Sequence, residues 1–332
     1  MKFIIKPLGL VLLSIVLVAC GAGVTKTDDG FLLYEGKTWI AEEGNPITLY
    51  ILNDSTCGAD CDSAAGIEFF RQNITRALSI KEVDVNDALG KDLIADFDPL
   101  GVPVFILGDG IKTLERNGEK MYDKIQPVLT EKNNRFLVDG NAIRMKIGKY
   151  LKEITFADLD SEPVKGDGPV TVVEFTDFQC PYCKRLHDQT KDAIANLIEE
   201  GKITYVVKDF PLSFHAEAKA MHIAANCALK TEGIEAYANT KNFVFDNQQA
   251  FGGKGDAGAK AYLIEESAGF GIADQDAFAA CVNSGEMDAE IQADVQEGVK
   301  FGVSGTPAIF VGNKFIPGAI SAEALIQAVN GQ

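Results

Sequence analysis

Apolar and polar positions follow two periodicities along this chain, one typical of strands and one typical of helices. Residues 168–178, GPVTVVEFTDF, are rich in β-branched and aromatic side chains and predict a buried strand. Residues 183–200, CKRLHDQTKDAIANLIEE, predict a helix. Its apolar side chains recur on one helical face, at Leu186, Ala193, Ile194 and Leu197. The Cys-Pro-Tyr-Cys sequence at 180–183 therefore lies where a strand turns into a helix.

The first half of the chain repeats the order of the second half. Residues 45–61, NPITLYILNDSTCGADC, predict a strand followed by Cys57 and Cys61, and a Val-Pro strand follows at Val102-Pro103. In the second half the corresponding strand is introduced by Thr306-Pro307. Cysteine and proline are 46 residues apart in the first copy (57 to 103) and 127 in the second (180 to 307), so the second copy carries about 81 more.

These additional residues predict helices only. Their apolar positions have helical spacing and their flanks are acidic or small, in the segments 217–230, 233–245, 259–270 and 274–300. A chain of 332 residues is long enough for two domains of ordinary size. We therefore expect two α/β domains, the second with an all-helical insertion at about 213–300.

The N-terminus has the layout of an export signal. Lys2 and Lys6 precede an apolar run from Leu8 to Val18. The sequence Leu-Val-Ala-Cys-Gly that ends this run resembles the lipobox of bacterial lipoproteins, which implies that Cys20 is acylated after cleavage. The alternative is an uncleaved membrane helix, although the run is shorter than the ~20 residues that a span needs.

The charge balance excludes one class of partner. The chain has 48 acidic and 31 basic residues, a formal net charge of −17, which becomes −19 when residues 1–19 with their two lysines are removed. Phosphate backbones are bound by Lys and Arg, so nucleic acid is not expected as a partner. The acidic excess suits solubility beside a membrane rather than adhesion to anionic lipid.

Six cysteines remain when Cys20 is set aside, and an even number in an exported chain suggests disulfides. Fifteen pairings exist in principle, but two pairs are very close in sequence. The favoured set is Cys57 with Cys61, Cys180 with Cys183, and Cys227 with Cys281.

The position of Cys180 predicts redox chemistry. At a helix N-terminus, the free N–H groups favour a thiolate over a thiol, and Cys183 can close a bridge one turn later. A zinc site would need two more ligands, and the only histidines are His187, His215 and His222. His187 is interpreted as a helix-surface residue rather than a catalytic base, although its cationic form could support a nearby thiolate. No metal and no cofactor are expected.

The strand followed by Cys-Pro-Tyr-Cys and a helix, together with the later Gly-Thr-Pro strand, resembles the thioredoxin superfamily, and the helical insertion resembles its DsbA-like members. The resemblance implies that Pro307 is cis and lies against the active cysteines. It also implies a substrate groove lined by Pro181, Tyr182, Thr306 and Pro307, where the backbone pairs with an extended peptide.

The resemblance assigns Glu174 to the buried acid that serves proton transfer at the inner thiol, so Cys180, Cys183 and Glu174 are the expected catalytic residues. The alternative for Glu174 is an acid at the end of a strand that faces water. For Cys227 and Cys281, which lie in helical apolar stretches, the resemblance supports a structural disulfide, and two free buried cysteines are the alternative.

The expected function is that of an extracytoplasmic thiol:disulfide oxidoreductase, lipid-anchored in the periplasm or on the outer cell surface. Exported proteins with cysteines would be its substrates, and a membrane quinone-linked thiol oxidase, DsbB-like or VKOR-like, would recycle it. A disulfide isomerase or reductase with the same site, and a non-catalytic peptide-binding protein, are the alternatives.

Cys57 and Cys61 mirror the position of Cys180 after a strand, which suggests a second redox pair that exchanges electrons with Cys180 or acts on substrates itself. Three residues separate them rather than two, and the neighbouring aspartates disfavour thiolates, so a structural staple is the alternative.

The expected divisions of the chain are a signal peptide at 1–19, a lipid-anchored linker at 20–44, a thioredoxin-like domain at 45–158, a linker at 159–168 and a DsbA-like domain at 169–332.

Overall fold

The structure is a computed structural model that describes residues 46–332 except residues 117, 144 and 158, together with three short strands before residue 46. These strands pair antiparallel and are β1 (Thr25–Lys26), β2 (Leu32–Tyr34) and β3 (Lys37–Thr38). Cys20 and the predicted export signal lie outside the described residues. Within the described part of the chain, no helix has the length and apolar character that crossing a membrane requires.

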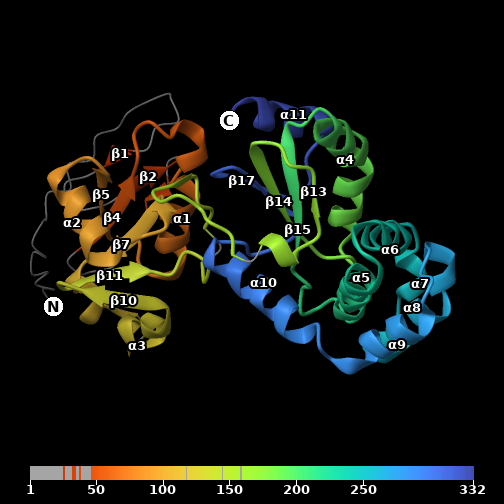
Figure 1. Ribbon diagram of the computed structural model, residues 1–332. Coiled ribbons are helices and arrows are strands. Elements are labelled where there is room, and N and C mark those ends of the chain that lie inside the picture. Colours follow the sequence, from red (N-terminus) through yellow and green to blue (C-terminus); the bar gives the residue numbers. More distant parts are fainter. Residues whose placement is uncertain are drawn as a thin grey trace, which may run out of the picture.

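A five-stranded mixed sheet forms the centre of the first domain (Figure 1). Its order is β10-β11-β7-β4-β5, with β4 parallel to β5 and antiparallel to β7. The strands are β4 (Ile47–Asn53), β5 (Leu78–Asp84), β7 (Val104–Leu107), β10 (Leu129–Lys132) and β11 (Arg135–Val138). The helices are α1 (Ala64–Asn73), α2 (Ala88–Phe97) and α3 (Met121–Ile125), and a small hairpin pairs β8 (Glu115–Arg116) with β9 (Glu119–Lys120).

Alternation along β4 builds a core on each face of this sheet. Leu49 and Ile51 pack with Phe70 of α1 on one face, whereas Leu52 packs with Leu93 of α2 on the other. Successive side chains of a strand point to opposite faces, so a central strand covered on both sides must be apolar at nearly every position.

The sheet of the second domain has the same plan. Its order is β13-β15-β14-β16-β17, and the central β14 is parallel to β15 and antiparallel to β16. The strands are β13 (Val164–Lys165), β14 (Val170–Thr176), β15 (Ile203–Asp209), β16 (Ala308–Val311) and β17 (Lys314–Pro317). Each sheet thus has a central strand between one parallel and one antiparallel neighbour, and the antiparallel neighbour follows a cis proline in both: Pro103 before β7 and Pro307 before β16.

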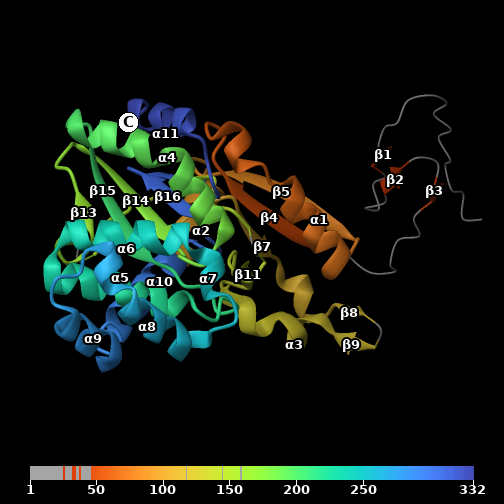
Figure 2. The same ribbon diagram turned by 90° about the vertical axis from the view of Figure 1, so that its right-hand side faces the viewer.

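Helices cover the second sheet and form the insertion between β15 and β16 (Figures 1 and 2). The helix after β14 is α4 (Pro181–Glu199), and α11 (Ala322–Asn330) ends the fold. The insertion consists of α5 (Ala218–Glu232), α6 (Ile234–Asp246), α7 (Gln248–Phe251), α8 (Gly255–Glu265), α9 (Gln275–Ser284) and α10 (Asp288–Lys300). The fold is therefore α/β with two thioredoxin-like domains, the second with an all-helical insertion.

The segment between the two sheets packs on the second domain. The Tyr150 hydroxyl donates to the carbonyl oxygen of Phe301 at 2.6 Å, and the Ile154 N–H donates to Asn313 at 2.8 Å. Tyr150 and Ile154 share a core with Phe175 and Phe310 of the second sheet. These contacts attach the first domain to the second through buried side chains.

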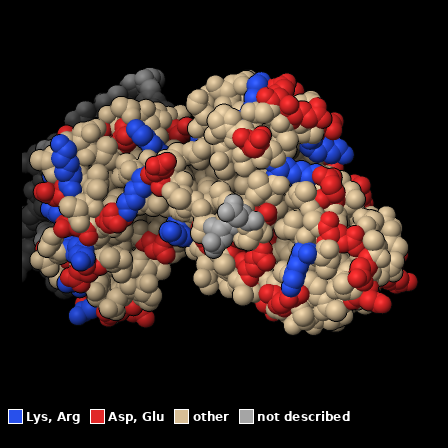
Figure 3. Space-filling model, in the orientation of Figure 1, with Lys and Arg blue, Asp and Glu red and all other residues tan. Residues whose placement is uncertain are grey.

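Acidic side chains gather over the insertion helices on the face shown in Figure 3, in keeping with the net charge of −17.

Candidate functional site

The Cys-Pro-Tyr-Cys sequence lies at the start of α4, directly after the central strand β14. Cys180 is the N-cap in an extended conformation (φ −71°, ψ 124°), and Pro181 is the first helical residue. A proline suits this position because its ring fixes φ near the helical value and its missing N–H would have no partner within the helix. The local sequence thus places the Cys180 sulfur beside the free N–H groups of the first turn.

The Cys180 thiol lies in a network that favours the thiolate. Its Sγ atom is 3.5 Å from the carbonyl oxygen of Thr306, and the Thr306–Pro307 peptide bond is cis. The pKa of Cys180 is lowered from 9.0 to about 6. The largest cause is a hydrogen bond from the Cys183 thiol, and the N–H groups of Cys183 and Tyr182 add to it, although burial acts in the opposite direction. Cys180 is therefore mostly a thiolate at neutral pH.

Cys183 has the opposite character. Burial, and then the hydrogen bond and charge of Cys180, raise the pKa of Cys183 well above its usual value. Both residues are buried, but Cys180 is 4% exposed whereas Cys183 is fully enclosed, so Cys180 is the more accessible sulfur of the pair. The N–H of Asp177 donates to the Cys183 sulfur at 3.4 Å.

The predicted bridge between Cys180 and Cys183 is not present in this structure, which holds both residues as free thiols. The two side chains are instead joined by a hydrogen bond, and both are buried. The remaining two predicted pairs are disulfides: Cys57–Cys61 in the first domain and Cys227–Cys281 in the insertion.

Two exposed aromatic residues mark the surface beside this site. Tyr182 is 55% exposed and carries Arg185 over its ring, with the guanidinium 4.8 Å from the centroid. Phe214 is 75% exposed and follows β15; the next residue, His215, contacts the Asp177 carboxylate at 2.8 Å. Asp177 thus links this aromatic loop to Cys183, since its carboxylate contacts His215 and its backbone N–H bonds to the Cys183 sulfur.

Glu174 is buried, so the alternative of an acid facing water is excluded. The Tyr205 hydroxyl donates to its Oε2 atom, and the Lys241 ammonium lies 3.9 Å from the same oxygen. Lys241 also donates to the Tyr205 hydroxyl at 3.1 Å. The second oxygen, Oε1, is buried without a hydrogen-bond partner among the described residues. A cavity of about 260 Å³ lies at this group and is lined by Glu174, His187, Tyr205 and Lys241 among others.

His187 differs from the helix-surface residue that was predicted. Its ring is half-buried and stacks on Phe245, with centroids 5.0 Å apart. Burial, and then the charge of Lys241, lower the pKa of His187 to about 4. The imidazole is therefore neutral at pH 7 and supplies no positive charge to a thiolate.

Sequence reasoning did not identify several polar groups around the thiols. Gln248, at the start of α7, donates from Nε2 to the carbonyl oxygens of Phe178 (2.8 Å) and Cys180 (3.1 Å). His222 stacks on Phe178 and bonds to Asp209 at 2.5 Å. Gln248 and His222 belong to the insertion, and no local sequence motif identifies them. Asp177 could have been identified from the sequence, because it lies only three residues before Cys180.

The structure brings together one group of the predicted residues and separates the others. Cys180, Cys183, Thr306 and Pro307 meet at the start of α4, with Pro181 and Tyr182 in its first turn. Cys57 and Cys61 belong to the first domain, and the Cys227–Cys281 bridge joins α5 to α9. Among the described residues, no cluster of three or more His, Cys, Asp or Glu side chains is arranged to hold a metal ion.

Comparisons with solved structures give several similar folds. They include alpha-DsbA1 from Wolbachia pipientis (21% identity, TM-score 0.46, covering 52% of this chain and 92% of that one). BdbD from Bacillus subtilis is another (19% identity, TM-score 0.45, 52% and 94%), as is a thioredoxin-like oxidoreductase from Silicibacter pomeroyi DSS-3 (24% identity, TM-score 0.41, 52% and 91%).

Curated relatives match the same proportion of the chain. The Na(+)/H(+) antiporter NhaA of Herminiimonas arsenicoxydans is 26% identical over 172 residues, covering 51% of this chain and 25% of that protein. NhaA 1 of Salinispora arenicola is 30% identical over 176 residues, covering 52% and 25%. The chain thus spans about a quarter of the length of these antiporters, and their names describe the whole proteins.

A family model described as thioredoxin matches residues 165–331, which is half of the chain. The matched segment includes β14, Cys180, Cys183, the helical insertion and the cis Pro307. From this match, the chain belongs to the thioredoxin family, and a further domain with the same sheet plan precedes the matched segment.

Proposed function

We propose that this protein is an extracytoplasmic thiol:disulfide oxidoreductase that forms or exchanges disulfides in exported proteins through Cys180 and Cys183. The observation that carries this proposal is the contrast between the two sulfurs. Cys180 is the more accessible sulfur and has its pKa lowered to about 6, whereas Cys183 is fully buried and has its pKa raised. A pair of this kind has one sulfur for the substrate and one for the internal bond.

In the oxidising direction the reaction begins with the bridged form of the pair. A substrate thiolate attacks the Cys180 sulfur, the bond to Cys183 breaks, and a mixed disulfide joins substrate to Cys180. A second substrate thiolate then attacks the substrate sulfur of that mixed disulfide. Cys180 leaves as a thiolate, the substrate gains a disulfide, and the enzyme retains two electrons as its reduced pair.

Cys183 takes up a proton when the bridge opens, because its sulfur is buried and the pKa of its thiol is raised. Glu174 is a buried acid of β14, the strand that leads to this pair, and one of its oxygens has no hydrogen-bond partner among the described residues. In this proposal Glu174 donates the proton to Cys183 on reduction and accepts it on oxidation, exchanging it through the adjacent cavity.

The lowered pKa of Cys180 supports the oxidising direction. Ionisation of Cys180 stabilises the reduced form only at pH values above its pKa of about 6. At pH 7 this stabilisation is about 1.4 kcal/mol relative to a thiol of ordinary pKa. For a two-electron couple this raises the reduction potential by about 30 mV. A more stable reduced form makes the oxidised form a better oxidant.

The substrates proposed for this site are extended segments of exported proteins. Residues 304–306, just before Pro307, belong to no strand in the described structure, so their backbone is open to pairing with a peptide. Tyr182 and Phe214 offer exposed apolar rings beside this position. Such a site recognises backbone and apolar side chains rather than one sequence.

For recycling, the reduced pair needs an electron acceptor, and we assign this role to a membrane quinone-linked thiol oxidase of the DsbB-like or VKOR-like kind. A lipid on Cys20 would keep the protein at the same membrane. The export signal and the acidic charge support this location.

The direction of the reaction is tested on the full chain in mixtures of reduced and oxidised glutathione, by trapping free thiols and quantifying Cys180 by mass spectrometry. An oxidase has a potential well above that of a thioredoxin-like reductant, near −120 to −200 mV. A potential near −270 mV would instead support the reductase alternative.

A further inference from the structure

The first domain contains a second sulfur placed beside a cis proline. The Sγ atom of Cys61 lies 3.7 Å from the carbonyl oxygen of Val102, and the Val102–Pro103 bond is cis. In the second domain, Cys180 has the same relation to Thr306 and the cis Pro307, at 3.5 Å. The two domains therefore place a cysteine sulfur beside the same backbone position; in the first domain the sulfur belongs to the second cysteine of the pair, Cys61, and in the second domain to the first, Cys180.

The two positions differ in what covers them. In the first domain, the short strand β6 (Gly101–Val102) pairs antiparallel with β12 (Lys149–Tyr150) of the same chain. The N–H of Gly148 donates to the carbonyl oxygen of Val102 at 2.8 Å, and the N–H of Leu151 donates to Leu100 at 3.0 Å. Residues 148–151, which we call the strap, thus occupy an edge that an extended peptide would use for strand addition.

The strap fits this edge closely. A Cβ atom at Gly148 would come within 2.2 Å of the carbonyl oxygen of Asp60 and 2.8 Å of the Cys61 sulfur. A Cβ atom at Gly101 would come within 2.6 Å of the carbonyl oxygen of Lys149. Two glycines, one on each strand, therefore permit a backbone approach that any side chain would prevent.

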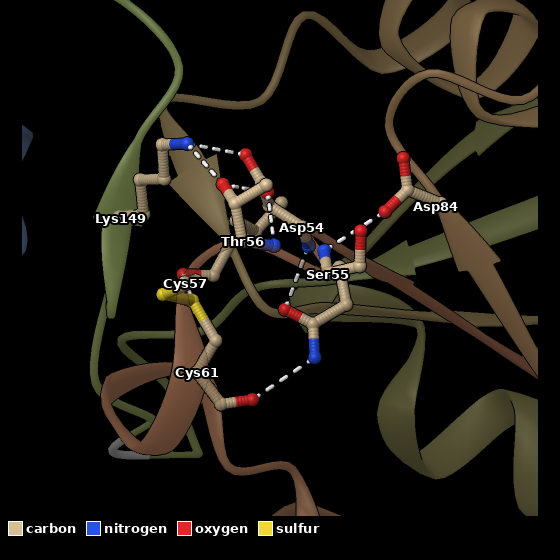
Figure 4. Close-up of a disulfide and its surroundings, with 9 residues drawn as sticks. Asp54, Ser55, Thr56, Cys57, Cys61, Asp84 and Lys149 are labelled. Atoms are coloured by element: carbon tan, nitrogen blue, oxygen red, sulfur yellow. Dashed lines mark hydrogen bonds and ion pairs between the residues drawn. A yellow bond between two sulfur atoms is a disulfide. The ribbon is translucent and has the colours of Figure 1, made fainter.

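A lysine side chain fixes the strap beside the disulfide (Figure 4). The Lys149 ammonium lies 2.5 Å from the buried carboxylate of Asp54 and 3.1 Å from the Thr56 hydroxyl. Asp54 and Thr56 come just before Cys57, and the N–H of Cys57 donates to the carbonyl oxygen of Asp54. The strap thus contacts both ends of the loop that the disulfide closes, which contains the 3₁₀ helix Gly58–Cys61.

The two cysteines of this disulfide differ in accessibility, as in an exchange site. Cys57 is half-buried, whereas Cys61 is only 3% exposed. An attacking thiolate can therefore reach Cys57 and leave Cys61 as the departing sulfur. The bond closes a separation of only 4 residues, against 54 for Cys227–Cys281. In the chain-entropy model, a disulfide that closes a short loop stabilises the folded state less than one that closes a long loop. By thermodynamic linkage, the folded state then stabilises this disulfide less against reduction.

We propose that Cys57 and Cys61 form a second thiol–disulfide exchange site and that the strap is its internal pseudosubstrate. While the strap is in place, the site reacts with low-molecular-weight thiols and excludes polypeptide thiols. A thiolate of the small thiol attacks the Cys57 sulfur and the bond to Cys61 breaks. A second thiol attacks the small-thiol sulfur of this mixed disulfide. Two small thiols become one disulfide, and Cys57 and Cys61 each end as thiols.

The test uses the full chain with Cys180→Ser and Cys183→Ser, so that the proposed function in the second domain makes no contribution. The probes are reduced glutathione and a reduced, unfolded polypeptide with cysteines. Trapped thiols and adducts are assigned to each cysteine by mass spectrometry. We expect Cys57–Cys61 to open in glutathione mixtures that leave Cys227–Cys281 intact, and the glutathione adduct to appear on Cys57.

Strap variants test the pseudosubstrate role in the same background. Gly148→Ala and Lys149→Ala should each raise the ratio of the polypeptide rate to the glutathione rate by at least about fivefold, since overpacking or loss of the ion pair releases the strap. Gly140→Ala is the matched control, because a Cβ atom there meets nothing within 4 Å. If Gly148→Ala fails to fold, Lys149→Ala alone decides. The proposal is overturned if Cys57–Cys61 resists glutathione as strongly as Cys227–Cys281, or if the strap variants change both rates equally or match the control.

Discussion

The Cys180 sulfur lies 3.5 Å from the carbonyl oxygen of Thr306, a residue 126 positions later in the chain. This contact joins the start of α4 to the loop that precedes β16. The helical insertion lies between these two segments in sequence, yet it leaves the contact intact because it connects β15 to β16 outside the sheet. Further features of the protein make predictions that can be tested separately.

Cys180 should titrate at about pH 6. Its alkylation rate in the reduced protein should rise with pH through a midpoint near 6, because the thiolate is the nucleophile and its pKa is lowered by the Cys183 thiol and the first-turn N–H groups. Cys183 should not react in the folded protein. The measurement is the rate of iodoacetamide labelling at each cysteine from pH 4 to pH 10, and a midpoint near 9 would contradict it.

The same lowered pKa has a consequence for stability, with a defined sign. A folded-state pKa below the unfolded value stabilises the reduced protein in full above about pH 9, and this contribution is lost as the pH falls through about 6. The oxidised protein has no such thiolate. The difference in free energy of unfolding between the two forms should therefore change across this window in urea titrations.

Glu174→Gln should slow the steps in which Cys183 gains or loses a proton by about tenfold or more, because an amide of the same shape cannot carry the proton. The midpoint of Cys180 alkylation should change little. Single-turnover kinetics across pH separate these two effects. Glu235→Gln is the control, since Glu235 is an exposed acid paired with Lys165; equal pH–rate profiles for Glu174→Gln and wild type would show that Glu174 has no role in proton transfer.

Lys208→Met should destabilise the fold by about 3–5 kcal/mol. The Lys208 ammonium is buried and lies 2.7 Å from Glu162, 2.8 Å from Asp294 and 3.0 Å from Glu297, so its removal leaves buried carboxylates without a counter-charge. Lys219→Met is the matched control: Lys219 pairs with Asp288, both half-exposed, and should cost less than about 1 kcal/mol. Urea unfolding of the two variants gives the comparison, and similar losses would refute the buried-cluster argument.

Cys20 should be the first residue of the mature protein and should carry acyl chains. Mass spectrometry of the protein from its native host should show an N-terminal peptide that begins at Cys20 and carries added acyl mass, and Cys20→Ala should prevent lipidation. A chain that keeps Met1 would indicate an uncleaved membrane helix.

Much of the fold follows from local patterns. The β-branched run before Cys180, the proline at the first helical position and the helical spacing between 217 and 300 each predict the element that the structure contains. The repeat of strand, cysteines and proline predicts the shared sheet plan of the two domains. Patterns of this kind are readable because each depends on residues close together in sequence.

The remaining features depend on contacts between distant segments. His215 reaches Asp177 across 38 residues and Lys241 reaches Tyr205 across 36, and neither pair lies in a periodic pattern. The strap is too short for strand periodicity, and its pairing with β6 shows only in three dimensions. The half-burial of His187 has the same origin, since Phe245 of α6 covers its ring.

The central claim, that Cys180 is the sulfur that exchanges with substrate, is tested most directly by peptide oxidation and insulin reduction with the full chain. Cys180→Ser should abolish turnover in both assays while its thermal unfolding transition stays close to that of wild type, and Cys183→Ser should accumulate a mixed disulfide between substrate and Cys180. Wild-type turnover by Cys180→Ser would contradict the account and leave a peptide-binding protein built on thioredoxin folds.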